Sequence, residues 1–433
     1  MARSSTTKPS ALVDGLVFTA GAFMALLIFF GLYSFLSPDP VPNRLSSISL
    51  PLSSPRTNRS THDPSDQTFY DDPSLTYTIE KPISNWDEKR SAWLKLHPSF
   101  SAKTERVLMV SGSQPKPCPS YDGDHLLLRS LKNKVDYCRI HDIELFYNTV
   151  HFHPSMPTFW AKIPVIRAAM LAHPEADWVW WVDSDAIFTD MDFFLPLDRY
   201  RDHNMVVHGW PKLVYEEKSW VALNAGVFLI RNCQWSLDFM DEWASMGPPS
   251  PDYEKWGKIL TSTFKNKVFT DSDDQSALVY LILTGKGGWR DKIYLENEYY
   301  FEGYWVEIVG RLENIAARYN EMEKRGPAVL RRRHAEGVFV SYAKQRDAQL
   351  GRENGAVSGP KGWKRPFLTH FTGCQPCNGK RNEQYSGDNC TEGMYKALNF
   401  ADDQVLRAYG FRHANMLSGD VQPLPFDYPR ARI

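Results

Sequence analysis

The chain has 433 residues, of which 42% are hydrophobic and 13% aromatic, so it can bury the core of one large domain or of two ordinary ones. Its formal net charge of −1 offers no basic surface for wrapping nucleic acid, which argues against that class of partner. Six cysteines are too few for a disulfide scaffold, but their even number is compatible with a secreted or lumenal compartment. The sequence leaves their pairing open.

The N-terminal segment predicts a membrane anchor. Residues 15–37 carry no charged side chain and are long enough to cross a bilayer as a helix. No small-residue cleavage site follows, so we expect an uncleaved signal anchor. The basic residues within positions 1–14 favour a cytoplasmic tail, which makes the chain a type II membrane protein with a lumenal remainder. Sequons at Asn58 and Asn389 agree with this orientation, because glycosylation would require the lumen.

The remainder divides into a stem, one globular domain and a tail. Residues 38–83 are rich in Pro, Ser, Thr and Asp and poor in large aliphatic side chains, so they are expected not to fold alone. The globular domain is expected over residues 84–415, with a C-terminal tail at 416–433.

The first half of the globular domain alternates strands and helices. Strands are expected at 106–110, 143–147 and 178–182, and helices at 126–141 and 159–172. Asp124 is expected to cap the first of these helices. This alternation is typical of a nucleotide-binding α/β half-domain. Neither a G-x-G-x-x-G fingerprint nor a Walker lysine occurs, which argues against a dinucleotide dehydrogenase and a P-loop ATPase.

The second half continues with mixed elements. Further strands are expected at 204–208, 223–230 and 365–370, and helices at 234–245, 253–264, 276–283 and 392–409. Residues 302–353 are charged and helical in pattern, so the arginines at 331–333 are expected on a solvated helix rather than in a polyanion site.

An acidic tripeptide follows the most hydrophobic strand. Residues 178–182 read as a buried strand that ends on Asp183, Ser184 and Asp185. Ligands of open α/β sheets bind beyond the carboxyl ends of strands, so this acid pair could hold a divalent cation against a substrate phosphate. A helix cap or a solvated turn is the alternative for so short a motif. His370, which also follows an apolar strand, is the best candidate for a further ligand, although a lone histidine is more often structural.

Other polar groups also follow expected strands. Residues 111–114 could offer backbone N–H groups to phosphate oxygens. The acidic run at 271–275 opens a helix, with plain N-capping as the alternative to a catalytic role. A zinc site is conceivable but less favoured than disulfides in a lumenal domain. Its ligands would be Cys374, Cys377, Cys390 and His370.

Several tryptophans could stack on sugar rings, although most tryptophans belong to the core. The candidates are Trp210, Trp220 and Trp305. Together these patterns indicate a lumenal, metal-assisted enzyme that acts on a nucleotide-linked substrate. A membrane-tethered glycan-binding protein would need the aromatic residues but not the acid pair. A metal-dependent phosphohydrolase would need a water-activating base and usually a second metal.

Six motifs occur in order along residues 86–411. They are Trp180–Ala186, His208–Trp210, Leu223–Gly226, Asp273–Ser276, Gly303–Trp305 and His370–Cys374. Together they resemble the plant glycosyltransferase family 34, which contains galactomannan 6-α-galactosyltransferases and xyloglucan 6-α-xylosyltransferases. The resemblance implies an α/β GT-A fold with a Rossmann-like nucleotide-binding domain, residence in the Golgi membrane, a UDP-sugar donor and Mn2+. It also implies transfer with retention of configuration onto O6 of a β-1,4-linked polysaccharide, and a homo- or hetero-oligomer with other Golgi glycosyltransferases.

The resemblance also implies roles for individual residues. The manganese ligands would be Asp183, Asp185 and His370. The nucleotide would be bound by Gly112, Ser113, Gln114, Asp124, Ser184, Gly373 and Lys380, with Gly373 near the diphosphate. The sugar and acceptor would meet the catalytic residues Asn224, Asp273, Asp274 and Gln275.

One position departs from the xylosyl members, which usually carry Lys where this chain has Gln375. Lys380 or Arg381 would then supply the missing cation. Four segments are more similar in sequence to the galactosyl branch: residues 207–210, 224–235, 301–305 and a helix at 331–336. The resemblance therefore implies transfer of galactose from UDP-galactose to a mannan, galactomannan or glucomannan backbone. A xyloglucan 6-α-xylosyltransferase that uses UDP-xylose is the alternative.

Overall fold

The computed structural model describes most of the chain between residues 66 and 426. The described ranges are 66–100, 104–332, 334–352, 362–383 and 389–426. The chain divides into two units, residues 1–59 and residues 60–433, and every described residue belongs to the second. The expected cytoplasmic tail, the anchor at 15–37 and the sequon at Asn58 lie outside the described residues. Along the described ranges, no helix combines the length and the apolar character needed to cross a bilayer.

A six-stranded sheet forms the centre of the second unit, in the order β2-β1-β3-β6-β5-β7. The strands are β1 (Val107–Gly112), β2 (Glu144–Asn148), β3 (Trp178–Val182), β5 (Met205–Gly209), β6 (Leu223–Arg231) and β7 (Ile293–Glu296). All of them run in the same direction except β6, which is antiparallel to β3 and β5. This parallel-rich sheet with connecting helices confirms the predicted α/β, Rossmann-like fold class.

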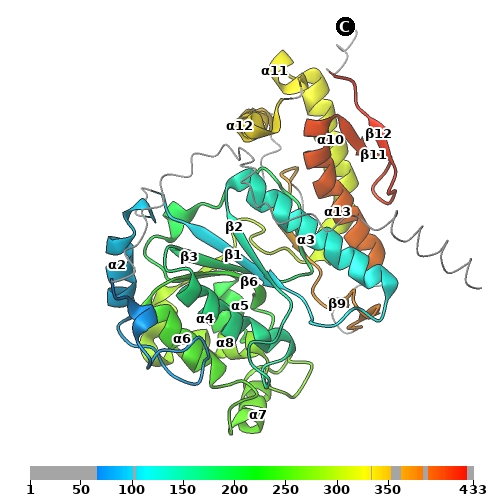
Figure 1. The fold of residues 1–433 in the computed structure, drawn as a ribbon. Coiled ribbons are helices and arrows are strands. Elements are labelled where there is room, and N and C mark those ends of the chain that lie inside the picture. The colour runs from blue at the N-terminus through cyan, green and yellow to red at the C-terminus, as the bar shows by residue number, and fades with distance from the viewer. Residues whose placement is uncertain (1–65, 101–103, 333, 353–361, 384–388, 427–433) are drawn as a thin grey trace, which may run out of the picture. The chain divides into compact units, whose positions relative to one another are not determined.

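Both faces of the sheet are covered, because every side chain of β3 is buried and alternate side chains point to opposite faces. Trp181 belongs to the core on the face of α4, α6 and α8, whereas Trp180 belongs to the core on the face of α3 and α13. The covering helices are α3 (Tyr121–His141), α4 (Lys162–Ala172), α6 (Gln234–Ala244), α8 (Asp274–Thr284) and α13 (Cys390–Leu406). Figure 1 shows α4, α6 and α8 grouped together and α3 lying along α13.

The other strands of the described residues form three two-stranded sheets. They are β4 (Ala186–Phe188) with β8 (Leu368–His370), β9 (Cys374–Gln375) with β10 (Lys380–Arg381), and β11 (Phe411–His413) with β12 (Val421–Pro423). The other α-helices are α2 (Trp86–Leu96), α5 (Pro211–Tyr215), α7 (Tyr253–Thr263), α9 (Trp305–Ile308), α10 (Leu312–Arg325), α11 (Ala328–Arg331) and α12 (Glu336–Arg352). Short 3-10 turns are Phe69–Asp71, Pro98–Phe100, Thr158–Ala161, Leu197–Tyr200, Lys286–Lys292, Val309–Arg311 and Arg407–Tyr409.

Two expectations about helices are wrong. Helix α3 begins at Tyr121 with Ser120 as its N-cap, so Asp124 lies inside the first turns and does not cap the helix. The carboxylate of Asp124 instead accepts hydrogen bonds from the backbone N–H of Cys118 at 3.1 and 3.2 Å. The expected helix at 331–336 is interrupted, since α11 ends at Arg331 and α12 begins at Glu336.

Candidate active site

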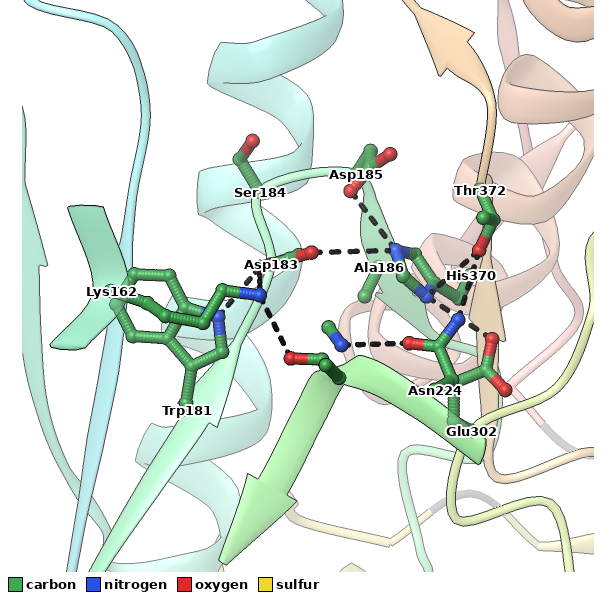
Figure 2. A network of polar contacts seen from close by, with 12 residues as sticks. Lys162, Trp181, Asp183, Ser184, Asp185, Ala186, Asn224, Glu302, His370 and Thr372 are labelled. Carbon is green, nitrogen blue, oxygen red and sulfur yellow. Dashed lines mark hydrogen bonds and ion pairs between the residues drawn. The ribbon is translucent and has the colours of Figure 1, made fainter. Parts of the chain in front are cut away.

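Strands β4 and β8 bring the acid pair and the histidine together. The chain turns after β3 at Asp183–Asp185, and Ala186 of β4 then pairs directly with His370 of β8. The Nε2 atom of His370 lies 3.3 Å from Asp185 Oδ1 and 3.8 Å from Asp183 Oδ2. One ligand atom from each of the three residues lies within 4.8 Å of the others. Figure 2 shows both carboxylates directed toward the His370 ring. The three side chains can therefore converge on one cation.

Gly226 leaves the space that such a cation would need. Because β6 runs antiparallel to β3, its amino end lies beside the end of β3, and Asp183 N–H donates to Gly226 O at 2.8 Å. A Cβ atom at Gly226 would lie 2.4 Å from His370 Cε1 and 2.6 Å from Asp183 Oδ2. Two carboxylate oxygens and one imidazole nitrogen around an open space fit a divalent cation such as Mn2+. The ligand assignment itself stays a prediction.

A buried carboxylate holds the other side of the His370 ring. Glu302 Oε1 lies 3.1 Å from His370 Nδ1, and Thr372 Oγ1 lies 3.1 Å from the same nitrogen. Burial lowers the pKa of His370, but the charge of Asp185 and the hydrogen bonds with Asp185 and Glu302 outweigh it and raise the pKa to about 10. A cation at Nε2 would therefore displace a proton. Glu302, which the sequence did not single out, fixes the ring orientation.

A buried lysine from α3 lies beneath the acidic turn. The side chain of Lys134 is fully buried, and its Nζ donates to Ala186 O at 2.8 Å and to Ser184 O at 3.1 Å. Burial lowers the pKa of Lys134 to about 8, although the charges of Asp185 and Asp183 oppose this shift. The backbone carbonyl of Ser184 is thereby committed to the protein, which leaves its N–H and hydroxyl for the predicted nucleotide contact.

A second buried lysine, from α4, approaches the turn from the opposite side. Lys162 Nζ lies 2.7 Å from Asp274 Oδ2 and 3.8 Å from Asp183 Oδ1, and donates to Ala225 O at 2.8 Å. Burial lowers the pKa of Lys162, but the charges of Asp183 and Asp274 outweigh it and raise the pKa. Figure 2 shows the lysine beside the indole of Trp181, with its Nζ directed toward Asp183. The signal in the sequence was a lysine at the first position of a helix whose other charged residue is Arg167.

Two of the predicted catalytic residues hold the start of β6. Asn224 Oδ1 accepts from Gly226 N–H at 2.7 Å, and its Nδ2 donates to Thr372 Oγ1 at 3.3 Å. Gln275 Oε1 accepts from Ala225 N–H at 3.3 Å, and its Nε2 donates to Trp220 O at 3.0 Å. Asn224 therefore lies at the candidate metal site, whereas Gln275 reaches it through the backbone of β6.

The other two predicted catalytic residues are occupied by protein contacts. Asp273 is the N-cap of α8, accepts from Ser276 N–H at 2.8 Å and pairs with Lys267 at 3.1 Å. Asp274 is buried against Lys162, and burial raises its pKa to about 6 despite that neighbouring charge. The capping alternative is confirmed for Asp273, and a catalytic role for either carboxylate stays a prediction.

The predicted nucleotide-binding residues at the end of β1 form a compact turn. Gly112 allows close approach of β2, because a Cβ there would lie 2.3 Å from Asn148 O. Ser113 N–H donates to the same carbonyl at 3.0 Å, so it is not available to a phosphate, contrary to expectation. Gln114 Nε2 contacts Cys118 Sγ at 3.2 Å. Cys118 forms a disulfide with Cys377, which ties this turn to the segment after β8.

The segment after His370 carries the other predicted nucleotide contacts. Gly373 has a φ of +86°, which favours glycine, and its carbonyl accepts from Asn382 N–H at 2.8 Å. Gln375 of β9 pairs directly with Lys380 of β10. A cation therefore lies opposite the position at which xylosyl members usually carry lysine, and its role as a substitute stays a prediction.

Disulfides exclude the zinc alternative. Cys118 pairs with Cys377, and Cys374 pairs with Cys390, while Cys138 and Cys233 are free. The thiols that the zinc site would need are thus consumed.

A Rossmann-like sheet with an acid pair and a histidine beyond its strand ends is suited to an enzyme that handles a nucleotide-linked substrate. The profile of the galactosyl transferase GMA12/MNN10 family matches residues 103–381. The chain therefore belongs to this family of glycosyltransferases, and the predicted GT-A form of the fold agrees with its sheet.

Named relatives extend the similarity to nearly the whole chain. A probable glycosyltransferase 7 from Oryza sativa subsp. indica is 61% identical over 99% of this chain and 94% of its own. Galactomannan galactosyltransferase 1 from Cyamopsis tetragonoloba is 56% identical over 99% of both chains. A probable xyloglucan 6-xylosyltransferase 3 from Arabidopsis thaliana is 45% identical over 84% of this chain and 73% of its own. The similarity is higher and more complete on the galactosyl side.

Proposed function

We propose that this enzyme transfers galactose from UDP-galactose to O6 of mannosyl residues in a β-1,4-linked mannan, galactomannan or glucomannan, forming an α-1,6 linkage. The convergence of Asp183, Asp185 and His370 at the strand ends is the observation that carries a nucleotide-sugar transferase. The 56% identity to a galactomannan galactosyltransferase favours galactose and mannan. Transfer of xylose to xyloglucan is the second candidate, which the 45% identity to a probable xylosyltransferase supports.

We propose Mn2+ as the cofactor, held by Asp183, Asp185 and His370. The donor set and the space over Gly226 support this choice. The bound ion would supply Lewis acidity toward the departing UDP diphosphate. Lys380, opposite Gln375, would add a positive charge on the diphosphate side.

We further propose that the acceptor attacks from the face that UDP leaves, so that configuration is retained without a covalent intermediate. The pairing of Asp273 with Lys267 and of Asp274 with Lys162 supports this route, because both carboxylates are engaged within the protein. Asn224, at the metal site, would position the donor sugar, and an oxygen of UDP would accept the O6 proton. A glycosyl adduct trapped on either aspartate would contradict this proposal.

The proposed location is the Golgi membrane, with a single N-terminal anchor at 15–37 and a lumenal catalytic domain. The charge-free anchor segment supports this topology. Two disulfides suit an oxidising compartment. Asn389 is exposed at the start of α13, where a sequon can be glycosylated.

Donor competition tests the proposal. Purified full-length protein is assayed with Mn2+, UDP-galactose or UDP-xylose, and manno- or cello-oligosaccharides. Galactose transfer to manno-oligosaccharides is expected. Xylose transfer to cello-oligosaccharides would favour the second candidate, and release of free sugar alone would indicate a hydrolase. Asp183→Asn should abolish transfer, which a glycan-binding protein would not require.

A further inference from the structure

Trp210 follows β5 with an exposed indole, which takes no part in the contacts of the candidate active site. Trp210 is 42% exposed, whereas Trp220 and Trp305 are 7% and 5% exposed. The expectation that Trp220 and Trp305 stack on sugars is therefore wrong, because both are in the core. An exposed indole presents a wide apolar face that a ligand can cover.

The backbone places Trp210 beside the candidate active site. At the end of the antiparallel pair β5 and β6, Gly209 faces Leu223, and Trp210 N–H donates to Ala222 O at 2.9 Å. Asn224, which hydrogen-bonds Thr372 at the metal site, follows two residues after Ala222. The indole and the carboxamide of Asn224 thus come from the same end of one strand pair.

The local structure directs and supports the indole. The register of β5 and β6 shifts between Val207 and Gly209, and such irregularities re-aim side chains near active sites. A Cβ at Gly209 would lie 2.8 Å from Leu223 Cβ, so glycine permits the close approach of the two strands there. The buried ring of His208 packs edge-on against the indole, with ring centroids 4.6 Å apart at 75°. One side of Trp210 is therefore buttressed while the remainder faces solvent.

We propose that Trp210 is an acceptor-binding platform, on which one pyranose ring of the polysaccharide stacks against the exposed indole. This inference rests on the proposed function, because it requires a polysaccharide acceptor. The C–H face of a pyranose is apolar, and the indole offers a wide, rigid apolar face at a low entropic cost. Trp210 is a binding residue in this account, and it takes no part in bond making.

Steady-state kinetics of the full-length enzyme test the platform. Trp210→Ala should raise the KM for mannohexaose by about tenfold, the order expected for loss of one aromatic contact, while kcat changes by less than about twofold. The KM for UDP-galactose and the affinity for Mn2+ should not change. Trp210→Phe should recover part of the acceptor affinity. Trp363→Ala is the matched control, because Trp363 is 39% exposed but precedes β8 and does not belong to the pair of β5 and β6.

The outcomes separate this inference from the proposed function. An unchanged acceptor KM in Trp210→Ala overturns the platform, and so does an equal loss of donor and acceptor affinity, which would indicate a structural role. The melting temperature of each variant shows whether the fold is kept. If the wild-type enzyme transfers xylose to cello-oligosaccharides, the proposed function fails. The same variants assayed on cellohexaose then still decide whether Trp210 binds the acceptor.

Discussion

Two Asp-x-Asp tripeptides flank strand β4, and their surroundings differ. Asp183 and Asp185 precede the strand with side chains 29% and 19% exposed, and they face His370. Asp190 and Asp192 follow it with side chains 9% and 8% exposed. The second pair meets arginines rather than a histidine.

Ion pairs with two arginines occupy the carboxylates of the second tripeptide. Arg365 Nη1 lies 3.0 Å from Asp192 Oδ2 and 3.8 Å from Asp190 Oδ1, and Arg346 of α12 pairs with the same oxygen of Asp192. The lysines near the first tripeptide bind backbone carbonyls and one oxygen of Asp183, which leaves Asp185 and the other oxygen of Asp183 facing His370 Nε2. The same motif thus forms the proposed ligand set at one end of β4 and a structural clamp at the other.

The largest expected effect breaks the first pair. Asp185→Asn should reduce transfer by about 10³-fold, as removal of one essential electrostatic group does, because it removes the carboxylate nearest to His370 Nε2. Mn2+ binding followed by electron paramagnetic resonance should weaken in parallel. Stability should stay close to wild type, since no arginine loses its partner. Wild-type Mn2+ affinity in this variant would refute the ligand assignment.

The second expected effect breaks the clamp. Asp192→Asn should lower the free energy of unfolding by about 3 kcal/mol, because it leaves Arg346 and Arg365 buried without their shared carboxylate. Urea denaturation at pH 7 measures the change. Transfer activity at low temperature should remain near wild type. If activity fell as far as in Asp185→Asn while stability held, the contrast between the two tripeptides would be lost.

A smaller effect, on Mn2+ affinity, is expected from a change at the partner of His370 Nδ1. Glu302→Gln keeps a hydrogen-bond partner near His370 Nδ1 but removes the charge, so the Mn2+ affinity should fall by about 30-fold, within the range for second-layer partners. Isothermal titration calorimetry gives the dissociation constant. Glu307→Gln, at an exposed position of α9, is the control and should bind Mn2+ normally. Equal affinities in both variants would remove Glu302 from the site.

The smallest effect concerns pH and the clamp. Burial raises the pKa of Asp190 to about 7, partly offset by the charge of Arg365. A raised pKa in the folded state means that this group stabilises the fold at acidic pH and that the contribution is lost as pH rises from about 4 to 7. The unfolding free energy of wild type relative to Asp190→Asn should therefore fall by at least about 1 kcal/mol across this window. A difference in unfolding free energy that does not change with pH would contradict the raised pKa of Asp190.

The sequence predicted the elements of the sheet better than their connections. The strand at 178–182 was placed with its observed bounds, because a continuous apolar run fixes a buried strand. The antiparallel course of β6 was not predicted, since strand direction depends on the path of the connecting segments. The expected grouping of Asp183, Asp185 and His370 arises from β4, a strand of three residues that pattern alone does not separate from a turn.

The residues that sequence reasoning missed are charged side chains placed inside the protein. Lys134 and Lys162 were not singled out from the sequence, because a lysine in a helix is usually solvated. Their burial depends on carbonyls of β4 and β6 and on a carboxylate of α8, which lie far away in the sequence. Cys118 and Cys377 are 259 residues apart, so their pairing required the folded chain.

The disulfide between Cys118 and Cys377 also limits movement around the predicted nucleotide contacts. The turn after β1 and the segment after β8, which carry the predicted nucleotide contacts, are joined covalently through Cys118 and Cys377. Cys374 is joined in turn to Cys390 at the start of α13. The turn after β1 and the segment after β8 therefore cannot separate while the bond between Cys118 and Cys377 is intact. Enzyme made in a reducing cytosol would lack this covalent frame around the predicted nucleotide contacts.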